Sequence, residues 1–95
     1  MSLSVLEVHP IPSRERRLQG GAVIGRARDC EIHVEDPLVS RRHARVISSE
    51  LGTALEDLGS SNGVYVNGRR SGGVTPLHPG DVVQLGATLW LVQGR

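Results

Sequence analysis

Residues 62–68 of the 95-residue chain have the sequence Asn-Gly-Val-Tyr-Val-Asn-Gly. Asn-Gly is the dipeptide best suited to tight turns that need positive φ angles. Val, Tyr and Val favour the extended backbone of a half-buried sheet. The segment therefore predicts a three-residue strand, 64–66, with a tight turn on each side, and it indicates a fold built from short strands.

The rest of the chain repeats this pattern of short apolar or alternating segments separated by Gly and Pro. Twelve Gly and five Pro are scattered through it, and no stretch keeps the three-and-four spacing of a long amphipathic helix. Strand patterns cover residues 3–8, 16–18, 22–24, 31–34, 44–47, 53–57, 81–85 and 88–92. Gly20-Gly21 separates the second and third of these, which predicts a hairpin there. We expect an all-β fold of about ten to eleven short strands, a sandwich or a barrel.

Length, charge and cysteine content limit the classes of function. The size fits a single domain covering residues 1–95, which we expect to be a fragment of a longer protein. A net charge of +1 argues against bulk electrostatic binding to nucleic acid or membrane. No apolar run is long enough to cross a membrane and no signal peptide is evident. Cys30 is the single cysteine, so no internal disulfide forms, and we expect a monomeric domain in the cytoplasm.

Three predicted loop segments are more polar than an all-β fold needs: residues 24–26, 40–43 and 57–63. Arginine and serine side chains from different loops suit an oxyanion, because a guanidinium grips phosphate with two hydrogen bonds and a hydroxyl adds a neutral donor. An Asn side chain can pair with a peptide backbone. Taken alone, these residues fit solvated surface arginines and ordinary Asn-Gly turns better than an anion site.

The order and spacing of these segments resemble the forkhead-associated (FHA) domain. Gly25-Arg26 is followed fourteen positions later by the segment 40–43, Ser-Arg-Arg-His, and then by 57–63 and 66–68. No single piece is specific, but the ordered set covers the chain from about Val5 to Val92. The resemblance implies a sandwich of two antiparallel sheets, with recognition loops gathered at one end. It also implies a non-enzymatic module that binds phosphothreonine in partner proteins, as an adaptor in signalling or assembly.

The resemblance also assigns roles to particular residues. Arg26 and the Ser40 hydroxyl would bind the phosphate, with Arg41 as a second phosphate or peptide contact, while Ser61 and Asn62 would hold the peptide backbone. Gly25, His43, Gly63 and Asn67 match positions that support the site. Threonine is common in the family where this chain has Ser61 and Val64, which affects the floor of the pocket. No cofactor and no metal are implied.

Two other functions are compatible with the sequence. The domain could be a phosphate-independent protein-interaction scaffold, although such a scaffold has no need of Arg26 and Ser40. Ser40, His43 and Asp57 supply the residue types of a hydrolase triad, but a serine three residues before its histidine is poor triad geometry. Arg69-Arg70 follow a predicted turn, so we expect them to be exposed, where a basic rim would favour an acidic peptide.

Overall fold

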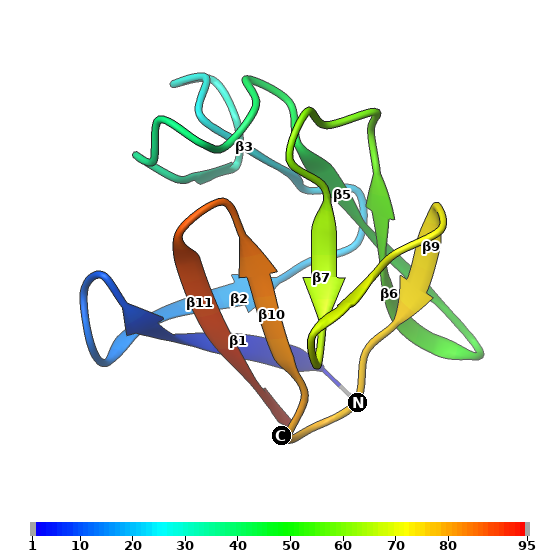
Figure 1. Cartoon of the computed structure of the whole chain (residues 1–95). Helices are drawn as coiled ribbons and strands as arrows, with labels where there is room; N and C mark the ends of the chain where they lie inside the picture. Colours follow the sequence, from blue (N-terminus) through cyan, green and yellow to red (C-terminus); the bar gives the residue numbers. More distant parts are fainter. Residues whose placement is uncertain (1, 95) are drawn as a thin grey trace.

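The computed structural model describes residues 2–94, which form eleven strands and no helix. One sheet has six strands in the order β2-β1-β11-β10-β7-β8 and the other has five in the order β4-β3-β5-β6-β9 (Figure 1). The strands of the first sheet are β1 (Leu3–His9), β2 (Arg14–Leu18), β7 (Val64–Val66), β8 (Arg69–Arg70), β10 (Val82–Leu85) and β11 (Thr88–Gly94). Those of the second are β3 (Val23–Gly25), β4 (Ile32–His33), β5 (Ala44–Ser49), β6 (Gly52–Asp57) and β9 (Val74–Pro76). The predicted all-β sandwich is confirmed.

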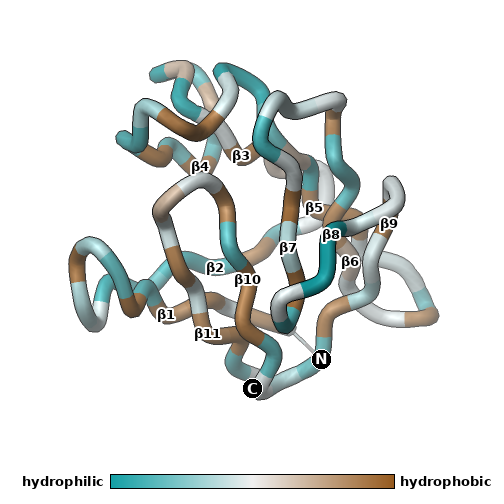
Figure 2. Tube along the Cα trace, in the orientation of Figure 1, coloured by the Kyte–Doolittle hydropathy of each residue, from teal (hydrophilic) through white to brown (hydrophobic). Residues whose placement is uncertain are grey.

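The core lies between the two sheets. On β7, Val64 and Val66 are buried while Tyr65 between them is partly exposed, as alternation along a strand requires. Trp90 on β11 is the largest fully buried side chain, and Ile24 and Leu55 from the second sheet are also fully buried. Figure 2 shows apolar residues recurring along β7 and β10 in the middle of the molecule. The two sheets therefore share one apolar interior.

The hairpin predicted across Gly20-Gly21 is wrong, because β2 and β3 belong to different sheets. Gly21 has a φ of 87° and donates its N–H to the Val46 carbonyl at 2.8 Å. A Cβ on Gly20 would lie 2.9 Å from the Cβ of Ser48. The two glycines carry the chain from one sheet to the other close to β5, rather than reversing it within a sheet.

Neighbouring strands are antiparallel throughout, except β3 and β4, which run parallel. The loops β3–β4, β4–β5 and β6–β7 lie at one end of the sandwich, at the top of Figure 1. Most residues of the polar segments singled out in the sequence lie in these loops, while Ile24, Gly25 and Asp57 are at the ends of β3 and β6. In the described part of the chain, no helix is long and apolar enough to cross a membrane.

Candidate functional site

Backbone hydrogen bonds hold the β3–β4 loop against the β4–β5 loop. The Arg26 N–H donates to the Ser40 carbonyl at 3.0 Å, and the Ala27 N–H donates to the Arg41 carbonyl at 3.1 Å. The His43 N–H then donates to the Ile24 carbonyl at 2.8 Å, where β5 begins beside β3. Arg26 and Ser40 are therefore brought together although fourteen positions separate them in the sequence.

Gly25 permits this close approach because it has no side chain. A Cβ there would lie 2.1 Å from the carbonyl oxygen of Arg41 and 3.1 Å from the Cα of Arg42. The same carbonyl oxygen accepts a hydrogen bond from the Cys30 thiol at 3.3 Å. Burial raises the pKa of Cys30, and the nearby Asp29 carboxylate adds to the rise, so the thiol keeps its proton as a donor. The contacts of the Arg41 carbonyl with Gly25 and Cys30 thus hold the loop that carries Ser40 and Arg41 in place.

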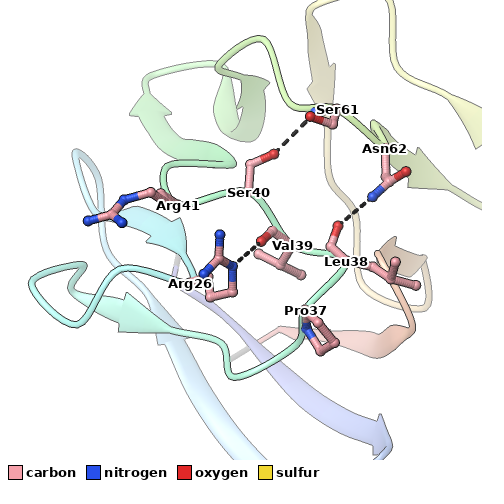
Figure 3. A pocket seen from close by; sticks show the side chains of 8 residues that line it. All are labelled: Arg26, Pro37, Leu38, Val39, Ser40, Arg41, Ser61 and Asn62. Carbon is pink, nitrogen blue, oxygen red and sulfur yellow. Dashed lines mark hydrogen bonds between the residues drawn. The ribbon is translucent and has the colours of Figure 1, made fainter.

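The side chains of Arg26 and Ser40 are each fixed by one contact that leaves other polar groups available. Arg26 donates Nε–H to the Val39 carbonyl at 3.0 Å, which leaves its two terminal nitrogens for another acceptor (Figure 3). The Ser40 Oγ accepts the N–H of Ser61 at 3.1 Å. Its own hydroxyl hydrogen remains available as a donor.

His43 joins the β4–β5 loop to the β6–β7 loop. Its ring is fully buried, and Nδ1 accepts the Ser40 N–H at 3.0 Å. Nε2 lies 2.7 Å from the Gly63 carbonyl oxygen, so Nε2 carries the hydrogen and donates. Gly63 has a φ of 85°, a conformation that glycine adopts without strain. A neutral imidazole therefore connects the backbone beside Ser40 to the backbone beside Asn62.

Asn62 forms a second link between the β6–β7 loop and the β4–β5 loop. Its Nδ2 donates to the Leu38 carbonyl at 2.7 Å. Figure 3 shows its amide oxygen pointing away from Leu38, so that oxygen can accept from a peptide N–H. Asn62 is exposed. The amide is held in one orientation by the protein while its acceptor faces outward.

These residues surround one hollow of about 370 Å³. Its lining consists of Arg26, Pro37, Leu38, Val39, Ser40, Arg41, Ser61 and Asn62. The lining includes two arginines and no carboxylate, so the hollow favours an anion. The guanidinium of Arg41 extends outward from the hollow, away from Ser40 and Ser61 (Figure 3). The five residues expected to contact a ligand thus line a single surface.

Asp36 supports this surface and was not singled out in the sequence. Its carboxylate accepts the Leu38 N–H at 2.9 Å, and on the other side the Ala87 N–H at 2.8 Å and the Thr88 hydroxyl at 2.9 Å. Burial alone raises the pKa of Asp36, but these hydrogen bonds outweigh burial and hold the pKa below its ordinary value. The Asp-Pro-Leu sequence at 36–38 indicates the bond to Leu38, since Asp commonly accepts a hydrogen bond from the backbone two residues ahead.

Asn67 lies elsewhere, in the turn between β7 and β8. It has a φ of 53°, and its amide bonds Asp81 at 3.0 Å and the Val82 N–H at 2.9 Å. It fastens this turn to β10 and does not line the hollow. Among the residues expected to support the site, Gly25, His43 and Gly63 therefore lie against the loops, whereas Asn67 supports the sheet.

The triad residue types do not form a hydrogen-bonded relay. Both ring nitrogens of His43 face backbone groups, and the Asp57 carboxylate accepts the Ser60 N–H at 2.8 Å. Over residues 2–94, no three His, Cys, Asp or Glu side chains gather in an arrangement that could hold a metal ion.

The fold and the site define an all-β module with a cationic hollow formed by three loops. The FHA domain family matches residues 22–86, and this chain belongs to that family. It is 45% identical over 78 residues to the ABC transporter ATP-binding/permease protein Rv1747 of Mycobacterium tuberculosis. It is 36% identical over 84 residues to the transcriptional regulatory protein EmbR of the same species. These matches cover 77% and 86% of this chain, but 9% and 22% of the two relatives.

Solved structures agree with this assignment. EmbR in complex with a low-affinity phosphopeptide superimposes with a TM-score of 0.89 at 28% identity, covering 97% of this chain and 24% of that one. A second structure, from an analysis of phosphothreonine-dependent FHA domain interactions, also gives a TM-score of 0.89, at 30% identity. It covers 100% of this chain and 98% of its own. The antiparallel-dominated sandwich is thus the fold of FHA domains.

Proposed function

We propose that this domain binds phosphothreonine-containing segments of partner proteins and acts as an adaptor in signalling or assembly. The observation that carries the proposal is the convergence of Arg26, Ser40, Ser61 and Asn62 on one hollow without a carboxylate in its lining. The relatives support the ligand class, since one structure contains a phosphopeptide and another concerns phosphothreonine-dependent interactions.

The phosphate docks against Arg26 and Ser40. The terminal nitrogens of Arg26 donate to two phosphate oxygens, because Nε is already occupied by the Val39 carbonyl. The Ser40 hydroxyl donates to a third oxygen while its lone pair keeps the Ser61 N–H. Arg41 is exposed beside them and rotates inward to add a second cation. Arg26 and Ser40 together offer donors to three oxygens, so with Arg41 the site suits a phosphate dianion better than a carboxylate, which has one oxygen fewer.

The peptide backbone runs over the β6–β7 loop. The outward-facing oxygen of Asn62 accepts an N–H from the residue next to the phosphothreonine, and the exposed Ser61 adds a polar contact. Because the Leu38 carbonyl fixes the Asn62 amide at 2.7 Å, little side-chain entropy is lost on binding. The peptide is therefore read through its phosphate and its backbone together.

Calorimetric titration of matched phosphothreonine and threonine peptides tests the proposal. We expect binding of the phosphorylated peptide alone, and a loss of at least about a hundredfold in Arg26→Ala, because two charge-assisted hydrogen bonds disappear. Arg28→Ala is the matched control, since Arg28 is also exposed and lies outside the hollow. Equal binding of both peptides, or unchanged affinity in Arg26→Ala, would favour a phosphate-independent scaffold instead.

The proposal also concerns the setting in which the domain acts. Its ligand is protein rather than nucleic acid or membrane, in keeping with a net charge of +1. The isolated domain is monomeric and acts in the cytoplasm without a cofactor or metal. Sedimentation of the isolated domain would check the monomer.

A further inference from the structure

Arg70 lies beside the proposed peptide site without belonging to the hollow. It is an exposed residue of β8, at the edge of the six-stranded sheet. A Cβ placed on Gly63 would lie 2.8 Å from Nε and 3.2 Å from Nη2 of Arg70. The guanidinium therefore covers the backbone of Gly63, immediately after Asn62.

Arg70 forms no ion pair with another of the described residues. The ion pairs among the described residues join Arg42 to Asp29, Arg45 to Glu56 and His78 to Asp81, and none includes Arg70. Its partner across the β7–β8 pair is Tyr65, so an aromatic side chain shares its face of the sheet. The Arg70 guanidinium lies over Gly63, on the face of the sheet that it shares with Tyr65, and is available to an acidic group of a ligand.

The distance from the phosphate site to Arg70 is short enough for one peptide to span. The Ser61 N–H lies 3.1 Å from the Ser40 hydroxyl oxygen. From Ser61 to Gly63 the chain spans at most about 7 Å, and the guanidinium lies directly over Gly63. The hydroxyl and the guanidinium are thus within about 14 Å of each other, which an extended peptide covers in about four residues.

We propose that Arg70 selects an acidic residue in the bound peptide, at a position within four residues of the phosphothreonine. This inference rests on the proposed function, since it takes the phosphate to sit at Arg26 and Ser40. The carboxylate of the ligand meets the Arg70 guanidinium, and the stem of the ligand side chain lies against Tyr65. The preferred ligand is thus an acidic phosphopeptide.

A peptide scan tests this inference. The parent peptide has phosphothreonine flanked by alanine, and aspartate is moved through four positions on each side. We expect aspartate at one position to raise the affinity by about twofold to fivefold, the size of a favourable exposed ion pair. Arg70→Gln should abolish that gain, and Arg70→Glu should make lysine preferred over aspartate there.

Arg69→Gln is the matched control. Arg69 is also an exposed arginine of β8 and pairs with Val66 instead of Tyr65, so the two arginines lie on opposite faces of the strand. The aspartate gain should persist in Arg69→Gln if Arg70 makes a local contact. A flat scan, or equal losses in the two variants, would overturn the inference while leaving phosphothreonine binding intact. Failure of the parent phosphopeptide to bind would overturn the proposed function, and this inference with it.

Discussion

Substitution of Gly25 by alanine should damage both the stability and the ligand affinity of the domain. The new Cβ would lie 2.1 Å from the Arg41 carbonyl oxygen, about 1.3 Å short of the 3.4 Å of ordinary contact. That oxygen also accepts hydrogen bonds from Ala27 and Cys30, so the whole segment must move. Forcing extra volume into a packed site costs about 1–3 kcal/mol of unfolding free energy.

The same movement carries Ser40 away from Arg26, because the Arg26 N–H and the Ser40 carbonyl are bonded at 3.0 Å. Loss of one charge-assisted hydrogen bond to the phosphate costs about 1.5–3 kcal/mol, or about tenfold to a hundredfold in affinity. Urea unfolding measures the stability, and calorimetry with a phosphothreonine peptide measures the affinity at a temperature where the variant is folded.

Gly72→Ala is the control, since a Cβ on Gly72 meets no atom within 4 Å and no positive φ is required there. If Gly25→Ala matched Gly72→Ala in both measurements, the idea that Gly25 sets the position of the phosphate loop would be refuted.

Two other outcomes follow from the geometry. Because the pKa of Asp36 is lowered in the folded state, its stabilising contribution is present at neutral pH and lost as the pH falls below about 4. Asp36→Asn replaces one carboxylate oxygen by an NH2 donor, so either the Leu38 or the Ala87 N–H loses its acceptor; it should lose about 1–3 kcal/mol of stability at pH 7 and less at pH 3, as measured by urea unfolding. An equal loss at both pH values would contradict this. Phosphothreonine should bind about tenfold better than phosphoserine in the same peptide, from burial of one methyl group and a stiffer side chain. Equal affinities in parallel titrations would show that the site senses phosphate and backbone alone.

The sequence predicts the strands whose side chains alternate clearly. Residues 64–66 form β7 with the predicted bounds, because Asn-Gly turns on both sides fix where the strand begins and ends. By contrast, β8 and β9 have two and three residues and little apolar pattern, so they were not located. The glycine pair at 20–21 has the composition of a hairpin turn, and only packing against β5 shows that it joins two sheets.

The spacing of the motifs predicts the residues of the candidate site. It does not predict the contacts that support them. Nothing local in the sequence shows that Gly25 lies against the Arg41 carbonyl, because that contact joins segments sixteen positions apart. The hydrogen bonds from Ala87 and Thr88 to Asp36 join residues about fifty positions apart, so no local sequence pattern predicts them either. The position of Arg70 over Gly63 depends on the short pairing of β7 with β8. Long-range packing therefore accounts for most of what sequence reasoning missed.

A crystal structure of the domain with a phosphothreonine peptide tests the central claim most directly. The account predicts phosphate oxygens within about 3.2 Å of the terminal nitrogens of Arg26 and of the Ser40 hydroxyl. It also predicts the Asn62 amide oxygen bonded to the peptide backbone. A phosphate bound elsewhere, for example on the exposed arginines of β2 or β8, would contradict it.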